Sequence, residues 1–174
     1  MTNDSAQAAF FAKELQDPEN NRCFDCGKIN PTWCSVNNGV YLCLACAGSH
    51  RGYGVHISFV RSLTLDVFEP NQFAMMRLGG NARAKAYFEE HPFDPPTYCV
   101  KWDCESADKY RRLLKRKTCD ETGETYYENP PWQPTRRMEI NSNRPVMGAG
   151  NIIPQQTHTQ IRKKKCCCGL CVVV

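Results

Sequence analysis

Two pairs of cysteines constrain what this chain can fold into more than any other feature of its sequence. Cys23, Cys26, Cys43 and Cys46 follow the pattern Cys-x2-Cys-x16-Cys-x2-Cys. Each pair can form a tight turn around a metal ion, and the intervening loop brings the two turns together. Zinc is the default occupant of such a site, and four sulfur ligands leave no position for a reactive water. The pattern therefore predicts one structural Zn²⁺ ion and places any chemistry elsewhere.

Disulfide pairing is the alternative interpretation, and it requires an oxidising compartment and usually a secretory signal. The first five residues lack the basic start and apolar run of a signal peptide, and no stretch approaches the roughly 18 apolar residues of a membrane span. We therefore expect reduced, metal-bound cysteines in a cytoplasmic protein. The other cysteines before the tail show no ligand spacing, and free thiols are expected at Cys34, Cys99, Cys104 and Cys119.

The charge of the chain is unevenly distributed. Residues 1–140 hold 17 Lys and Arg against 18 Asp and Glu, a balance of −1, whereas residues 141–174 hold five basic and no acidic residues, a balance of +5. The net charge of +4 therefore comes from the tail. Because a folded domain that reads phosphates usually displays a basic surface of its own, this distribution argues against a zinc finger that binds nucleic acid.

Turn residues and hydrophobic spacing predict short helices around a small sheet. The sequence Asn-Asn-Gly at 37–39 lies between two apolar runs, which is typical of a β-hairpin. A further strand is expected over 57–60, and Asn81 is expected to cap a helix. That helix must end by Pro92, and the other helices are expected over 5–15, 47–50, 70–78 and 106–118.

The helix expected over 106–118 is amphipathic, with five basic residues around its polar side: Arg111, Arg112, Lys115, Arg116 and Lys117. The first interpretation is a solvated outer helix that packs on the metal domain. The alternative is a basic face that meets acidic lipid or an acidic partner.

A longer pattern continues past the last cysteine pair. Residues 43–66 read CLACAGSHRGYGVHISFVRSLTLD, preceded by Asn30-Pro31-x-Trp33 and followed, after the next helix, by Gly79-Gly80-Asn81. These motifs resemble the Arf GTPase-activating protein family, whose zinc domain is marked by CxxC-x16-CxxC-x4-R followed by GVHxSxVRS. The likeness spans roughly residues 8–130.

The resemblance implies an α+β fold, a small zinc-finger domain with a short antiparallel sheet surrounded by helices. It also implies a GTP-bound small GTPase of the Arf family as partner, with Arg51 supplied in trans as an arginine finger. Such an activator has no GTPase site of its own. By resemblance, Trp33 lies close to this arginine and either packs against it or contacts the GTPase. Asp66 is expected to orient neighbouring backbone or Arg61. Two alternatives remain open: Asp66 is only a turn residue, and Trp33 is only a core residue.

The last residues, 162–174, read RKKKCCCGLCVVV. Cys171 is fourth from the end and followed by aliphatic residues, which fits a prenylation box, and palmitoylation candidates precede it at Cys166, Cys167 and Cys168. Two lipid chains, or one chain with a basic cluster, anchor a protein stably. We therefore expect peripheral attachment to the cytosolic face of a membrane, Golgi or plasma membrane. The alternative is an unmodified terminus or a Cys-rich metal tract.

The sequence thus predicts three parts: a zinc domain over 1–130 with its motif core at 23–91, a mostly disordered linker over 131–161, and a lipid-anchor tail over 162–174. The predicted function is acceleration of GTP hydrolysis on an Arf-type GTPase at a membrane surface in vesicle traffic. A non-catalytic Arf-binding adaptor is the first alternative. A nucleic-acid-binding zinc finger is the second, and no nucleic-acid partner is expected. The sequence leaves the oligomeric state open.

Overall fold

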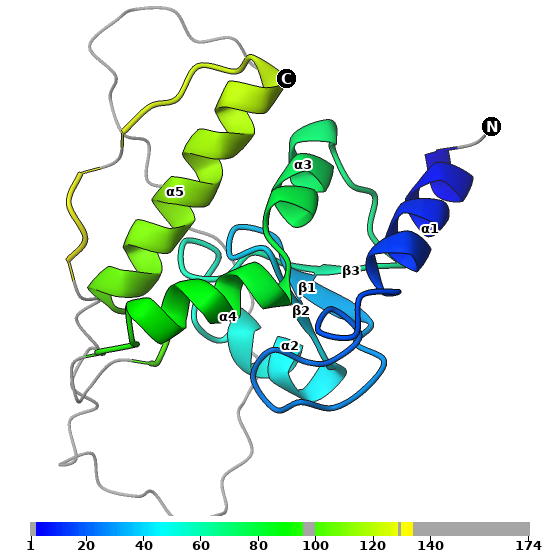
Figure 1. Ribbon diagram of the computed structural model, residues 1–174, viewed down its shortest axis with the longest axis horizontal. Helices are drawn as coiled ribbons and strands as arrows, with labels where there is room; N and C mark the ends of the chain where they lie inside the picture. The colour runs from blue at the N-terminus through cyan, green and yellow to red at the C-terminus, as the bar shows by residue number, and fades with distance from the viewer. Residues whose placement is uncertain (1–2, 96–99, 129, 134–174) are drawn as a thin grey trace, which may run out of the picture. The chain divides into compact units, whose positions relative to one another are not determined.

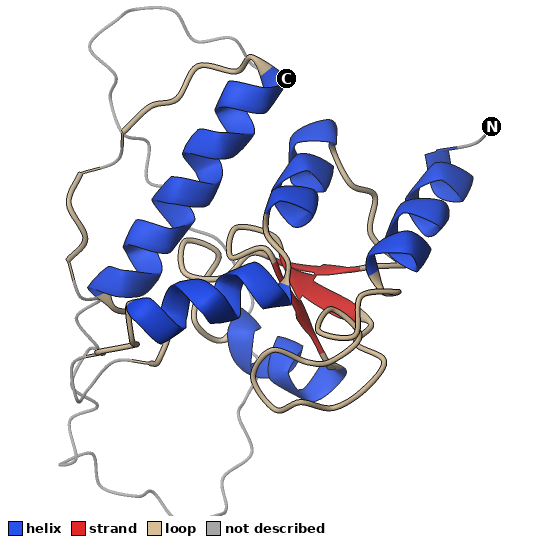
Figure 2. Ribbon diagram, viewed as in Figure 1, coloured by secondary structure: helices blue, strands red, loops and turns tan. Residues whose placement is uncertain are grey.

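A tight turn sets the register of the central sheet. In the computed structural model, which describes residues 3–95, 100–128 and 130–133, the Gly39 N–H donates to the Val36 carbonyl and Gly39 adopts a φ of 59°. Because glycine tolerates positive φ, the chain reverses direction here, and β1 (Trp33–Ser35) pairs antiparallel with β2 (Val40–Leu42). The expected hairpin is therefore confirmed. β3 (Val60–Ser62) pairs antiparallel with the other edge of β1, which gives the strand order β2-β1-β3 (Figure 2).

Helices surround this sheet (Figure 1). α3 packs against α5 on one side, and its Phe73 ring meets Phe10 of α1 on the other, with ring centroids 5.0 Å apart. The α+β fold expected from the resemblance is therefore confirmed. In the described part of the chain the helices are α1 (Asn3–Glu14), α2 (Leu44–Arg51), α3 (Pro70–Leu78), α4 (Asn81–Glu90) and α5 (Glu105–Thr122).

Two local expectations were wrong in detail. The strand expected over 57–60 begins only at Val60, because the N–H groups of Ile57 and Ser58 both bond to the Gly54 carbonyl in a turn. Asn81 does not cap α4, whose N-cap is Gly80. Instead, the Asn81 side chain is buried: it accepts the Tyr41 N–H at 2.8 Å and donates to the Arg22 carbonyl at 2.6 Å. It therefore ties α4 to the sheet and to the loop before the first cysteine.

The alternation of side chains along β2 divides the interior into two cores. Val40 and Leu42 face one core and Tyr41 faces the other. We call the first the cysteine core, because it includes Cys23 and Cys43. The second is the aromatic core, and its buried members are Phe11, Cys34, Val36, Tyr41, Leu63, Phe68 and Met76. The other buried members of the cysteine core are Ala47, Ile57, Ala84, Phe88, Trp102, Cys104, Ala107 and Tyr110.

All described residues belong to one compact unit, and most of the predicted linker and the whole predicted anchor lie outside them. Cys99 and the lipidation candidates Cys166, Cys167, Cys168 and Cys171 are among the residues that the structure does not describe. In the described segments, no helix combines the length and the apolar character that crossing a bilayer requires. The predicted division into three parts stays a prediction.

Candidate functional site

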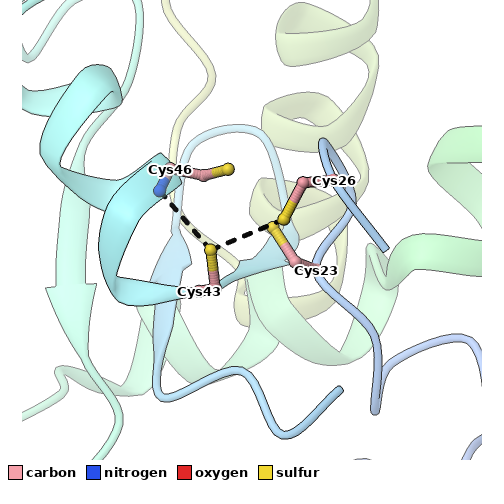
Figure 3. A group of neighbouring side chains, drawn as sticks. All are labelled: Cys23, Cys26, Cys43 and Cys46. Carbon is pink, nitrogen blue, oxygen red and sulfur yellow. Dashed lines mark hydrogen bonds between the residues drawn. The ribbon is translucent and has the colours of Figure 1, made fainter. Parts of the chain in front are cut away.

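Four thiols converge beside the sheet (Figure 3). Cys23 and Cys26 lie in a turn that the Gly27 N–H closes by donating to the Cys23 carbonyl at 2.8 Å. Cys43 and Cys46 lie at the N-terminal end of α2, where Cys43 is the N-cap. The four sulfur atoms all lie within 4.8 Å of one another, and those of Cys26 and Cys43 are 3.6 Å apart. The structure therefore brings the four predicted ligands together.

The geometry of the four thiols fits a tetrahedral metal site. Metal–sulfur bonds of about 2.3 Å in a tetrahedron place sulfur atoms about 3.8 Å apart, and four sulfurs are typical of zinc or iron–sulfur centres. The Cys46 N–H donates to the Cys43 sulfur at 3.5 Å, and this hydrogen bond lowers the pKa of Cys43 to about 7. Burial raises the pKa of Cys23 and of Cys46, which a bound cation would offset by favouring thiolates.

Arg51, the last residue of α2, is exposed and rests on an aromatic ring. Its guanidinium carbon lies 4.2 Å from the centroid of the Trp33 ring. Trp33 opens β1 and is half-buried against the cysteine core, so its ring is a fixed surface. A cation over an exposed indole gains about 0.5–1 kcal/mol, which favours one side-chain direction without using the N–H donors. The donors of Arg51 make no hydrogen bond to the described residues, and they remain available to a partner.

His50 anchors the last turn of α2 from the inside. It is fully buried, with 0% of its surface exposed. Its Nε2 lies 2.7 Å from Oδ2 of Asp25, between the first two cysteines in sequence, and its Nδ1 lies 2.7 Å from Oγ of Ser58. Because a carboxylate only accepts, Nε2 of His50 carries a proton and donates to Asp25, while Nδ1 lies within hydrogen-bonding distance of the Ser58 hydroxyl.

The Asp25 carboxylate is a meeting point of several donors. Its Oδ1 lies 3.4 Å from Nε1 of Trp102 and 3.4 Å from Nζ of Lys101. Burial alone would raise the pKa of Asp25, but the hydrogen bond from His50, with the Lys101 charge and the Trp102 N–H, lowers it below the usual value. The carboxylate therefore stays ionised and links the first cysteine turn to α2 and to the segment before α5.

Asp66 organises the loop that follows β3. Its Oδ2 accepts the Ser62 N–H at 2.6 Å, and its Oδ1 lies 3.7 Å from Nη1 of Arg61. From α1, Gln7 donates to the Asp66 carbonyl at 2.8 Å. Ser62 pairs with Trp33 across the sheet, so this loop borders the ring that carries Arg51. A turn residue would make the same contacts, so the role of Asp66 toward a partner stays a prediction.

Comparison with known proteins adds to this geometry. A family model named ArfGap, described as "Putative GTPase activating protein for Arf", matches residues 8–125. The chain belongs to the ArfGap family. It is 44% identical over 106 residues to ADP-ribosylation factor GTPase-activating protein 3 of Bos taurus, which covers 60% of this chain and 20% of that protein. It is 45% identical over 96 residues to ADP-ribosylation factor GTPase-activating protein GCS1 of Saccharomyces cerevisiae, covering 55% and 27%.

A solved structure gives the same result for the ArfGap fold. The crystal structure titled "putative GTPase activating protein for ADP ribosylation factor" from Cryptosporidium parvum is 40% identical and superposes with a TM-score of 0.56. The match covers 68% of this chain and 92% of that chain. The curated relatives are much longer, since the aligned part of this chain spans only about a fifth to a quarter of them.

Sequence reasoning missed several exposed apolar side chains near the ArfGap site. Leu44, directly after Cys43, is 66% exposed, and Leu65 and Val67 on either side of Asp66 are 81% and 58% exposed. Leu44 opens the helix that ends at Arg51, and Leu65 and Val67 belong to the loop after β3, whose Ser62 pairs with Trp33. The only signal in the sequence was their position inside the family motif, because a hydrophobic letter alone does not reveal exposure.

Proposed function

We propose that this chain accelerates GTP hydrolysis on a small GTPase of the Arf family, with Arg51 as the arginine finger. The observation that carries the proposal is the exposed guanidinium of Arg51, held 4.2 Å over Trp33 at the end of a helix that begins in the cysteine cluster. The family match supports an Arf-type GTPase as the partner.

The proposed chemistry belongs to the complex and not to this chain alone. Charge develops on the oxygens of the transferring phosphoryl group, and an arginine supplied in trans stabilises it. Such a residue contributes 10³ to 10⁵ in rate, about 4 to 7 kcal/mol. A lysine would be a poor substitute at Arg51, because the guanidinium presents a planar fork of donors and an ammonium does not. The chain itself supplies no GTP-binding site in this proposal.

The partner-binding surface proposed around Arg51 combines Trp33, the Asp66 loop and the exposed apolar residues. In this proposal Leu44 and Leu65 supply apolar area, and Trp33 supplies the exposed part of its half-buried ring. Asp66 acts through the loop, because its carboxylate is bound to the Ser62 N–H. A surface of fixed backbone reduces the ordering cost of docking.

Zn²⁺ is the ion that we propose for Cys23, Cys26, Cys43 and Cys46. Four thiolates complete its preferred tetrahedron, so the ion supplies folding energy and rigidity. Its proposed role in activation is indirect: the second cysteine pair starts α2, and α2 ends at Arg51.

Membrane attachment through the tail is a further part of the proposal. The supporting features are the basic run 162–165, the candidate palmitoylation residues Cys166, Cys167 and Cys168, and the candidate prenylation residue Cys171. Attachment to the cytosolic face of the Golgi or plasma membrane would concentrate the finger where a lipid-bound GTPase sits, in vesicle traffic.

The test is single-turnover hydrolysis on a panel of purified, GTP-loaded Arf and Arf-like proteins, with the chain in wild-type form and as Arg51→Ala and Arg51→Lys. We expect the wild type to accelerate at least one member, and both variants to lose at least about 10³ of the stimulation while staying folded. Binding of a GTP-loaded Arf protein without acceleration would replace this proposal with the non-catalytic adaptor. A chain that neither binds nor accelerates any member would overturn it.

A further inference from the structure

A buried network of polar side chains lies around His50, the residue before Arg51. Buried polar side chains are as a rule hydrogen-bonded, and a network whose members are all satisfied is rigid. Here the bonds continue: Oγ of Ser58 lies 2.8 Å from Oγ of Ser35, and Nδ2 of Asn38 donates to Oγ of Ser35 at 2.7 Å. Ser35, Asn38, His50 and Ser58 are all buried. The chain of bonds runs from the first cysteine turn, through α2, into the sheet.

This network clamps the end of α2 from two directions. The Asp25 carboxylate holds His50 from the first cysteine turn, and the Ser58 hydroxyl holds it from the loop that leads to β3. Ordinary helix ends fray, because their last carbonyls lack intrahelical partners. In α2 the next residue after this anchor is Arg51, so whatever fixes the His50 ring also fixes the backbone from which Arg51 projects.

Three separate segments therefore contact the His50 side chain: the first cysteine turn, the loop before β3 and the segment before α5. His50 also lies against two rings, with centroid distances of 5.0 Å to Tyr53 and 5.5 Å to Trp102. These rings prevent the imidazole from tilting, and the two hydrogen bonds set its rotation. Trp33 then directs the outer end of Arg51, while His50 directs its backbone end.

We propose that Asp25, His50 and Ser58 are positioning residues for Arg51, so that they set the rate of the activated reaction and leave the affinity for the GTPase unchanged. The inference rests on the proposed function. A displacement of about 1 Å far from the reacting atoms can cost about 10²-fold in rate. Loss of either hydrogen bond to His50, from Asp25 or from Ser58, should therefore lower kcat by about 10- to 100-fold. It should change KM for the GTP-loaded GTPase by less than about 2-fold.

The experiment compares Asp25→Ala with Asp25→Asn in the full chain. The asparagine keeps an oxygen that accepts from Nε2 of His50, so it should recover most of the kcat that the alanine loses. Ser58→Ala removes the other clamp from outside the cysteine turns, and it serves if Asp25→Ala fails to fold or to bind metal. Metal content and melting temperature are measured on every variant, and Phe11→Ala in the aromatic core gives a control that is destabilised away from the network.

A double-mutant cycle separates positioning from a general effect on the fold. If Asp25 and Ser58 act through the guanidinium, Asp25→Ala and Ser58→Ala should change the residual rate by less than about 2-fold in an Arg51→Ala background. Additive losses in that background, or a rise in KM at constant kcat, would overturn the inference. A wild-type chain that accelerates no GTPase sinks the proposed function itself. A wild type that accelerates, with both clamp variants equally fast, sinks only the positioning role.

Discussion

Both faces of the sheet are packed with aromatic rings, and the cysteine core adds the four thiols and the buried hydrogen bonds of His50. In the cysteine core, Cys23 and Cys43 are buried. His50 makes hydrogen bonds of 2.7 Å to Asp25 Oδ2 and to Ser58 Oγ. On the other face, the aromatic core is held by rings in edge contact, with Phe11 4.8 Å from Phe68 and 5.0 Å from Phe10. The face that carries Arg51 is the one that depends on metal ligands and hydrogen bonds.

The difference shows what each face has to achieve. Apolar packing supplies stability but is non-directional, so it tolerates small shifts of its members. Metal coordination and buried hydrogen bonds are directional, and they fix a side chain to within tenths of an ångström. The cysteine core must present the Arg51 guanidinium to another molecule in one direction, so it needs directional interactions. The aromatic core closes the fold, for which apolar packing is sufficient.

Two buried cysteines, one in β1 and one at the start of α2, make the contrast concrete. Cys34 of β1 is 0% exposed in the aromatic core, and burial raises its thiol pKa far above the usual value. Cys43, just after β2, has its pKa lowered to about 7 by the hydrogen bond from the Cys46 N–H. The same substitution at the two positions therefore compares the two faces directly.

The largest expected effect is that of Cys43→Ala. It removes one of four ligands from a site whose metal binding is coupled to folding, and structural Zn²⁺ contributes about 10–16 kcal/mol of apparent binding free energy in small domains. We expect the variant to lose its stoichiometric metal and most of its helical circular dichroism at 25 °C. A variant that keeps a native spectrum without metal would mean that apolar packing sustains the fold without the ion.

Phe11→Ala should give the next largest effect, and on stability alone. Phe11 is 3% exposed and contacts Phe68, Phe73 and Tyr41, so truncation should cost about 3–5 kcal/mol in the free energy of unfolding. Urea unfolding at constant metal content measures this loss. At a temperature where the variant is still folded, its kcat for stimulated hydrolysis should match wild type. A large fall in kcat would show that the two faces are mechanically coupled.

The same contrast explains what the sequence could and could not predict. The cysteine spacing, the hairpin turn at 37–39 and the helices are local patterns, and each was found within a few residues. The bonds of His50 to Asp25 and Ser58 join segments that are 25 and 8 residues away, and no local pattern marks them. The exposure of Leu65 was equally hidden, because it depends on what the rest of the chain leaves uncovered.

Asn81 is the clearest case of a residue whose local signal misled. Asn before an apolar helix usually caps it, and the sequence rule took no account of the unpaired Tyr41 N–H at the edge of β2. The Asn81 side chain satisfies that group at 2.8 Å, and Gly80 takes the cap position with a φ of 92°. A buried backbone donor without a partner costs more than a missing cap, so the tertiary contact prevailed.

Cys34→Ala should give the smallest effect, and it is the matched control for Cys43→Ala. Both substitutions remove a single sulfur from a buried cysteine, but Cys34 lies outside the group of four thiols. Loss of one buried atom of this size costs on the order of 1 kcal/mol, and we expect a lower melting temperature with the metal content and the stimulated rate both unchanged. Metal analysis, thermal unfolding and a single-turnover assay on the same preparation test the three expectations together. If Cys34→Ala lost metal as Cys43→Ala is expected to, the sheet would not separate the two faces, and the dependence of metal binding on the cysteine core alone would have to be given up.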